Sequence, residues 1–304
     1  MQCRLFCPFQ TALSCTIALL AASAPLRAAE KETVLPIHVP YRKLAQLQKS
    51  EISESSGLAC SRRTADVFWT HNDSGDKARV FAFDKQGLHR GTFVIKKAKN
   101  RDWEDMASFT LDGQRCLLLA DIGDNVLKAK FYKLYLVEEP ELDEIPAENE
   151  RLNLLQTVYF RYTDGAHDCE AMAFDATERR AYFAVKSATK SSDIYMLQWP
   201  PMSNSKDSAV IAERITAVAF PLVTGMDISP DGRRAVLLTY GLAYEFVRNE
   251  SETWEQAFSR PATPLIMPFR RQGESICYGP EANMLYLTSE KTPTPLFEAN
   301  TSEN

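Results

Sequence analysis

The sequence predicts an all-β fold, a single β-propeller of four-stranded blades, and three observations lead to this prediction. The first is an internal repeat, in which five segments share a polar residue, a small residue, an apolar anchor, a turn and a second apolar strand. The second is a constant offset, because an apolar or aromatic residue follows each anchor by ten positions. The third is the spacing of the anchors, which lie 48, 66, 54 and 50 residues apart. Repeats of about 40 to 50 residues with four short strands are typical of β-propellers.

The predicted strands follow in the same order in each repeat. The inner strands carry the anchors, which are Leu58, Met106, Met172, Met226 and Ile276. The second strands carry the residues ten positions later, which are Phe68, Cys116, Tyr182, Val236 and Tyr286. Asp-Gly pairs at 112–113 and 231–232 predict tight turns between these two strands, since Asp-Gly favours hairpin turns. Third strands follow as RVFAFD, FYKLYLVE, DIYMLQW, LAYEFV and PLFEA, and fourth strands are recognisable in most repeats.

The ring is predicted to close through the N-terminal part of the chain. The fifth repeat ends after its third strand, near Phe297, and the segment 41–48 can supply its missing outer strand. Such closure removes exposed sheet edges. We expect five blades, or six if one repeat is too divergent to recognise, whereas a β-sandwich would not explain the constant offset. The propeller is predicted to span residues 41–298, with 299–304 as a C-terminal tail and the acidic insert 138–150 as a loop.

The first 28 residues are predicted to be a signal peptide with an approximate cleavage site. Arg4 precedes an apolar run from Thr11 to Ala24, and Ala22 and Ala24 are small residues of the kind that a signal peptidase accepts. About 14 apolar residues are too few to span a bilayer. We therefore expect export to the periplasm or the extracellular space. The formal net charge of −5 argues against nucleic acid as a partner.

Four cysteines follow the predicted signal peptide: Cys60, Cys116, Cys169 and Cys277. Their wide spacing matches no paired zinc motif. An exported chain permits disulfides, and the sequence leaves their pairing open. Because three of the four lie in or beside strongly apolar strands, buried free thiols are favoured.

Acidic side chains gather in the two loops of each repeat that open on the same face of a propeller. The loop before the inner strand carries the residues two and four positions ahead of the anchors, which include Glu54, Asp102, Glu104, Asp168, Glu170 and Glu274. The loop after the second strand contains Asp-x-Gly-Asp in the first two repeats, beginning at Asp73 and at Asp121. One face of the propeller should therefore collect many carboxylates.

These carboxylates predict a divalent-cation site. Neighbouring carboxylates raise one another's pKa values, and a bound cation relieves that repulsion. Oxygen ligands favour Ca²⁺ over Mg²⁺, which needs waters to complete its shell. The candidate ligands are Glu54, Asp73, Asp102, Glu104, Asp121, Asp168, Glu170 and Glu274. The alternative is that these acids accept hydrogen bonds from loop amides and hold the face together.

Four further residues are candidates for contact with a substrate. His167, beside Asp168, is the candidate general acid or base, although a histidine next to an aspartate also serves structural roles. Trp103 could stack on a ring of the substrate or form an aromatic wedge between blades. Lys186 and Arg270 would suit an anionic ligand, or they are surface charges.

Several motifs carry a resemblance to a known group. HNDSGD, DWEDMA, DIGDN, the pair Asp168-x-Glu170 and SPDGRR resemble secreted bacterial β-propellers without an assigned reaction, and more distantly the phytase-like and gluconolactonase-type propellers. The resemblance covers about residues 50 to 290. Similarity to the phytase-like families implies a calcium-rich acidic face that acts on phosphate esters. Similarity to the gluconolactonase type implies one divalent metal that polarises a lactone carbonyl.

Two functions of different classes remain open. The first is a metal-dependent hydrolase of a small-molecule phosphate ester or lactone, and the second is a non-enzymatic module that binds an envelope protein or a glycan. Serine hydrolases with GxSxG, P-loop proteins, HExxH metalloproteases and Rossmann proteins are excluded because their motifs are missing. We expect a monomer that does not span the membrane, and the sequence leaves open whether it catalyses a reaction.

Overall fold

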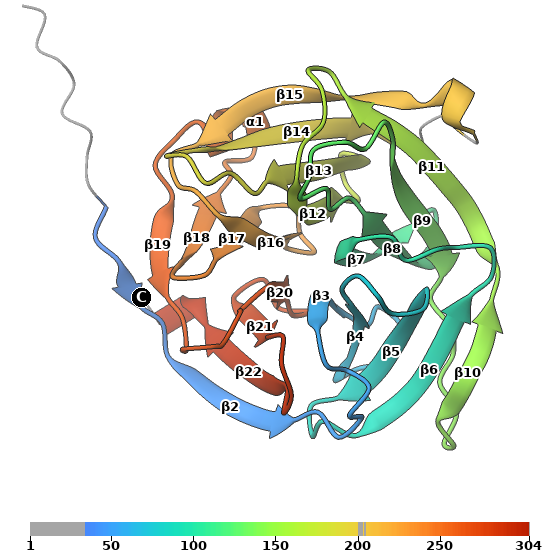
Figure 1. The fold of residues 1–304 in the computed structure, drawn as a ribbon. Coiled ribbons are helices and arrows are strands. Elements are labelled where there is room, and N and C mark those ends of the chain that lie inside the picture. Colours follow the sequence, from blue (N-terminus) through green and yellow to red (C-terminus); the bar gives the residue numbers. More distant parts are fainter. Residues whose placement is uncertain (1–33, 200–202, 204, 304) are drawn as a thin grey trace, which may run out of the picture. The chain divides into compact units, whose positions relative to one another are not determined.

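The ring of inner strands organises the fold. A computed structural model describes residues 34–199, 203 and 205–303, which form a compact unit of strands around a central axis (Figure 1). The predicted signal peptide lies outside the described residues. The inner strands are β3 (Ser55–Cys60), β7 (Trp103–Leu111), β12 (Cys169–Asp175), β16 (Val223–Ile228) and β20 (Ser275–Tyr278). They contact one another in that cyclic order, and β20 returns to β3.

Each inner strand begins an antiparallel blade that runs outward from the axis. The second strands are β4 (Val67–Asn72), β8 (Gln114–Asp121), β13 (Arg180–Val185), β17 (Arg234–Thr239) and β21 (Met284–Thr288). The third strands are β5 (Arg79–Asp84), β9 (Tyr132–Glu138), β14 (Ser192–Gln198), β18 (Ala243–Val247) and β22 (Pro295–Asn300). Four outer strands are β6 (His89–Ile95), β11 (Leu154–Tyr162), β15 (Val210–Val218) and β19 (Thr263–Ile266). This arrangement confirms the predicted all-β propeller.

The N-terminal strand closes the ring as the sequence predicts. Strand β2 (Tyr41–Gln46) pairs antiparallel with β22, so that Tyr41 lies opposite Ala299. Figure 1 shows these two strands from opposite ends of the chain side by side. Since β22 extends to Asn300, the tail predicted from residue 299 begins inside this strand.

Removal of the closing strand should weaken the whole fold. A chain that begins at Lys49 loses the backbone hydrogen bonds between β2 and β22 and leaves β22 as an open edge. At about 1 kcal/mol for each net hydrogen bond, we expect a loss of about 3 to 5 kcal/mol in the free energy of unfolding. Urea denaturation against a chain that begins at Pro40, which also lacks β1, measures this loss. Equal midpoints for the two chains would contradict the role of β2.

The structure differs from the sequence prediction in the acidic insert. Strand β10 (Ala147–Leu152) begins within the predicted loop, extends two residues beyond it and pairs in parallel with the edge of β6. A second short strand, β1 (Ile37–His38), pairs in parallel with β19, and helix α1 (Trp254–Phe258) packs beside β15 and β18. The described residues include no helix of the length and apolarity that a bilayer span requires.

The anchors form the core between neighbouring blades. All five anchors are at most 2% exposed, and large aromatic side chains pack between the blades behind them. The predicted turn at Asp112 and Gly113 has positive φ angles of 51° and 81°, which a two-residue hairpin of this type requires. The four described cysteines are buried free thiols, as favoured by the sequence.

Candidate functional site

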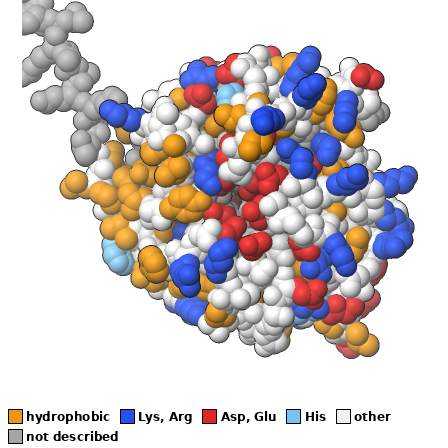
Figure 2. Space-filling model, viewed as in Figure 1, with side chains coloured by type: hydrophobic (Ala, Val, Ile, Leu, Met, Phe, Trp, Pro, Cys, Tyr) orange, Lys and Arg blue, Asp and Glu red, His pale blue; other side chains and the backbone are white. Residues whose placement is uncertain are grey.

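An acidic mouth lies where the inner strands begin. Figure 2 shows acidic side chains gathered at the centre of one face, with Lys and Arg side chains around them. The positions two residues before the anchors form the wall of this mouth and are occupied by Ser56, Glu104, Glu170, Thr224 and Glu274. Hydroxyl side chains hold the ring together, since Ser56 Oγ donates to the Glu104 carbonyl oxygen at 2.8 Å and Thr224 Oγ1 donates to that of Gly273 at 3.1 Å.

Three carboxylates converge at one side of the mouth. Asp73 follows β4, while Asp102 and Glu104 lie at the start of β7, and an oxygen from each lies within 4.8 Å of the other two. Gly123 permits this approach. A Cβ atom at Gly123 would lie 2.1 Å from Glu104 Oε1 and 2.6 Å from Asp102 Cγ, so only glycine fits here without displacing the carboxylates. We call Asp73, Asp102 and Glu104 the carboxylate triad.

The triad has almost no compensating partners. Glu104 is 4% exposed, yet no described side chain or backbone amide donates a hydrogen bond to its carboxylate or forms an ion pair with it. The Asp102 carboxylate likewise has no such partner among the described residues, and the Asp73 carboxylate accepts only from the backbone N–H of Ser74. Buried carboxylates usually have donors or counter-ions, because burial of an uncompensated charge is costly.

The electrostatics of the triad follow from this isolation. Burial, followed by the charge of Asp73, raises the pKa of Asp102 to about 6. Burial and then the charge of Glu170 raise the pKa of Glu104 well above its ordinary range. Burial also raises the pKa of Asp73. The triad therefore competes for protons at mildly acidic pH, and a cation would relieve the same repulsion.

The acids that the other blades contribute to the mouth have partners. Glu170 pairs with Lys186, and burial raises the pKa of Glu170 to about 8 although Lys186 opposes the shift. Tyr240 donates its hydroxyl to Glu274 Oε1 at 2.8 Å. Glu290, which is 5% exposed, accepts from Gln272 Nε2 at 2.8 Å. Neither Tyr240 nor Glu290 is among the predicted ligands, although both follow second strands, as Asp73 does.

The remaining predicted ligands are held by other contacts. Asp121 is fully buried, accepts from the Asp102 backbone N–H at 3.0 Å and from Lys133 Nζ at 3.1 Å, and is thereby fixed as a loop anchor. Asp168 accepts from the backbone N–H of Asp124 at 2.8 Å. Glu54 lies 3.5 Å from Lys291 Nζ. Of the eight predicted ligands, the structure thus brings Asp73, Asp102 and Glu104 together without a counter-ion among the described residues.

The described contacts of His167 and Trp103 lie away from the mouth carboxylates. His167 Nε2 lies 2.8 Å from Asp164 Oδ1 and 2.8 Å from the Tyr195 hydroxyl, so its contacts are in the third blade rather than with the mouth carboxylates. Trp103 is fully buried, lies against the ring of His71 at 5.5 Å between centroids, and donates Nε1 to the Lys99 carbonyl oxygen at 3.1 Å. Its ring is the aromatic wedge between blades and has no face exposed to a substrate.

A buried aspartate closes the axis behind the mouth. Asp105 Oδ1 accepts from the N–H of Met106 at 2.8 Å, and Oδ2 accepts from the N–H groups of Met172 at 2.9 Å and Met226 at 3.1 Å. One carboxylate therefore bridges β7, β12 and β16, and the neighbouring inner strands have the small residues Gly57, Ala171 and Gly225 at this level. In the sequence, Asp105 lies within the DWEDMA motif and is not among the predicted ligands.

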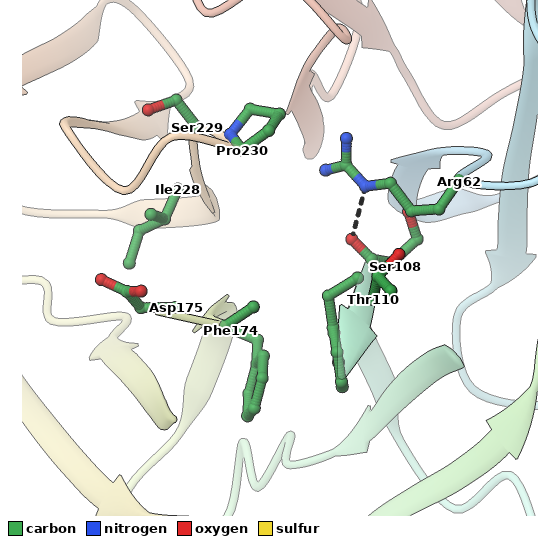
Figure 3. Close-up of a pocket in the computed structure, with 10 residues that line it drawn as sticks. Arg62, Ser108, Thr110, Phe174, Asp175, Ile228, Ser229 and Pro230 are labelled. Atoms are coloured by element: carbon green, nitrogen blue, oxygen red, sulfur yellow. Dashed lines mark hydrogen bonds between the residues drawn. The ribbon is translucent and has the colours of Figure 1, made fainter. Parts of the chain in front are cut away.

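The opposite face has a cavity where the inner strands end. This cavity of about 170 Å³ lies between the ends of β3, β7, β12 and β16 (Figure 3). Arg62 Nε donates to the Ser108 carbonyl oxygen at 3.0 Å. Asp175 accepts from Trp254 Nε1 at 2.8 Å and lies 3.4 Å from Arg248, so its carboxylate is satisfied. Among the described residues, this face has no group of converging carboxylates without counter-ions like that of the mouth.

Comparisons with known proteins add no family. No protein-family model matches the chain, and a search of curated protein sequences finds no match. Among solved structures, the WD40 domain of Pan2 from Neurospora crassa is 8% identical with a TM-score of 0.45, covering 86% of this chain and 95% of that one. A chain of the nidogen/laminin complex is 10% identical with a TM-score of 0.44, covering 78% of this chain and 73% of that one.

Proposed function

We propose that this propeller binds a divalent cation, Ca²⁺ in preference to Mg²⁺, at the carboxylate triad. The observation that carries the proposal is the buried Glu104 carboxylate, which has no described donor or counter-ion and lies beside Asp73 and Asp102. A cation would supply the charge that the protein does not.

The donor set fits a hard cation. Ca²⁺ binds oxygens at about 2.3 to 2.6 Å, so two of its ligands lie at most about 5 Å apart. The triad oxygens lie within 4.8 Å of one another. The three carboxylates supply oxygen donors and no sulfur or nitrogen, which favours Ca²⁺ or Mg²⁺ over zinc or copper. Asp73 and Asp102 are half-buried, so the site stays accessible from the solvent.

Calorimetric titration tests the proposal directly. The protein, freed of metal with EDTA, should bind one Ca²⁺ per chain and Mg²⁺ more weakly. Its thermal midpoint should rise, because a ligand at about 100 times its Kd adds roughly 2.7 kcal/mol to the free energy of unfolding. No binding heat and no shift with any divalent cation would leave the triad as a structural feature.

The cation effect should depend on pH in a defined direction. Because the pKa of Asp102 is raised to about 6 from 3.8, the folded state without cation binds more protons than the unfolded state within this interval. Its stability should therefore fall as pH rises through this interval, and Glu170, with a pKa of about 8, extends the fall upward. Ca²⁺ affinity should rise over the same range, because protons compete with the cation.

Thermal melts in EDTA and in Ca²⁺ across this pH range measure both effects. The two series of midpoints should diverge as the pH rises. Parallel series, or a midpoint in EDTA that rises steadily toward alkaline pH, would contradict the assignment of raised pKa values to these acids.

Hydrolysis of a phosphate ester or a lactone is the reaction that we propose for this site. A cation there would polarise the oxygen of the substrate and favour ionisation of water. Glu170, whose pKa burial raises to about 8 and which Lys186 contacts, would exchange a proton with the substrate or water there, the general acid or base role expected of His167 from the sequence. Turnover of p-nitrophenyl phosphate or a γ-lactone that needs Ca²⁺ and is lost in Glu170→Gln would support it. If no Ca²⁺-dependent turnover is found, the alternative function is favoured.

The alternative is a non-enzymatic module that binds an envelope protein or a glycan. One observation favours it, because none of the described histidines or cysteines forms a hydrogen bond or ion pair with the carboxylates of the mouth. In that case the cation shapes the binding face. A partner recovered from envelope extracts by the wild type, and lost with Asp73→Asn, would identify this function. Either function agrees with the export that we propose from residues 1–28.

A further inference from the structure

A basic pocket lies beside the acidic mouth on the last blade. Its volume is about 300 Å³, and it is bounded by the loops 267–274 and 289–294 and by strands β2 and β22. Both loops open on the same face as the mouth, since one precedes β20 and the other follows β21. The pocket and the mouth share one wall, Glu290.

The charges of the pocket are strongly biased. Its basic lining residues are Lys43, Arg270, Arg271 and Lys291, and its one acidic lining residue is Glu290. Glu290 is already engaged, because it accepts from Gln272 and lies 3.7 Å from Lys291 Nζ. No described carboxylate lies within ion-pair distance of Lys43, Arg270 or Arg271. The pocket therefore has an excess of positive charge without a protein counter-ion.

Arg270 is the fixed part of this charge. Its Nη1 donates to the Pro268 carbonyl oxygen at 3.1 Å, and its Nε is buried without any described hydrogen-bond partner. The guanidinium lies flat against Gly273, where a Cβ atom would come within 2.5 Å of Nε. Glycine at 273 thus permits the arginine to fold back over the backbone. A guanidinium held without a carboxylate is suited to an anion brought by a ligand.

The rim of the pocket is apolar. Phe269 is 89% exposed, which is unusual for a phenylalanine on a soluble protein and places its ring at the opening. Phe297, Pro293 and Pro295 complete the apolar part of the lining. A ligand that carried only an inorganic anion would leave these side chains unused.

We propose that this pocket binds a small organic anion, with the anionic group at Arg270 and an apolar body against Phe269. The site is separate from the carboxylate triad and does not require a cation there. A substrate or partner group that reached both sites would place its anionic end in the pocket and its reacting or chelating end at the mouth.

Calorimetry with phenyl phosphate tests the proposal on the intact protein in EDTA. The wild type should bind phenyl phosphate more tightly than inorganic phosphate, and benzylamine should not bind. Arg270→Gln should weaken the binding by about tenfold or more, as expected for loss of a charge-assisted hydrogen bond. Gly273→Ala should weaken it as well, because the added methyl group displaces the guanidinium while its charge remains. Phe269→Ser should weaken binding of phenyl phosphate and leave that of inorganic phosphate unchanged.

Arg233→Gln is the matched control, since Arg233 is an exposed arginine 3.8 Å from Glu250 and outside the pocket. It makes the same change in net charge and should bind phenyl phosphate like the wild type. Urea denaturation of each variant shows whether it is folded. The proposal is overturned if the wild type does not bind, if folded Arg270→Gln binds equally well, or if Arg233→Gln loses the same affinity. A protein that binds phenyl phosphate but no Ca²⁺ would retain this site and lose the proposed function.

Discussion

Asp105→Ala is expected to destabilise the fold by about 3 kcal/mol or more, because it leaves buried backbone N–H groups of three inner strands without an acceptor. Each unsatisfied buried donor costs about 1 to 3 kcal/mol. The carboxylate is 1% exposed and accepts from Met106, Met172 and Met226, so its loss acts on the centre of the ring. Equilibrium urea denaturation followed by tryptophan fluorescence measures the effect.

Two further variants should lose less free energy of unfolding than Asp105→Ala. Asp227 accepts from the backbone N–H groups of Ile228 and Tyr278, each at 2.8 Å, and thus joins one inner strand to one neighbour instead of two. Asp227→Ala should therefore cost less than Asp105→Ala. Asp143 is exposed and has no described polar partner, so Asp143→Ala should change stability by no more than about 0.5 kcal/mol. Equal losses for Asp105→Ala and Asp143→Ala would show that the central carboxylate does not hold the strands.

The repeat predicted the blades because the physical cause of each strand is local. Leu58 and the other anchors are apolar, and each is buried by the inner strand in which it lies. Asp112 and Gly113 have the positive φ angles that the tight turn between two strands requires. The closing role of residues 41–46 was also predictable, since the last repeat lacked an outer strand. A strand that pairs within its own repeat is thus marked in the sequence by the repeat pattern around it.

No such pattern marks strand β10 in the sequence. Its residues Glu148, Asn149 and Glu150 are exposed, so no apolar alternation marks it as a strand. It exists because the edge of β6 offers unpaired backbone groups, and because Lys49 Nζ contacts Glu148 at 2.9 Å from another part of the chain. A strand held mainly by long-range backbone pairing is a tertiary effect.

The site was predictable as a region and not as a set of ligands. Sequence position places acids at the mouth, but whether each carboxylate is paired depends on residues far along the chain. Lys133 neutralises Asp121, Lys186 neutralises Glu170, and no described cation pairs with Glu104. The buried Nε of Arg270, which has no described partner, could be found only in the structure.

Glu104→Gln is expected to abolish the stabilisation by Ca²⁺ and to leave the protein without cation at least as stable as the wild type. The first effect follows because the variant removes a charged ligand from the centre of the triad. The second follows because Glu104 is buried beside Asp73 and Asp102, so replacing its carboxylate by an amide removes repulsion and supplies two donors to those acids. Thermal melts in EDTA and in Ca²⁺ at mildly alkaline pH measure both effects in one experiment.

The combination of effects separates a cation site from a structural cluster. If the triad only held loops together, Glu104→Gln would lower the midpoint in EDTA, and any Ca²⁺ shift would persist. Glu213→Gln is the control, because Glu213 is exposed on β15 without a described partner and makes the same change in charge. Its Ca²⁺ shift should equal that of the wild type. Most of the pH dependence in EDTA should persist in Glu104→Gln, because burial is the main cause of the raised pKa values of Asp102 and Glu170 and both residues remain in the variant.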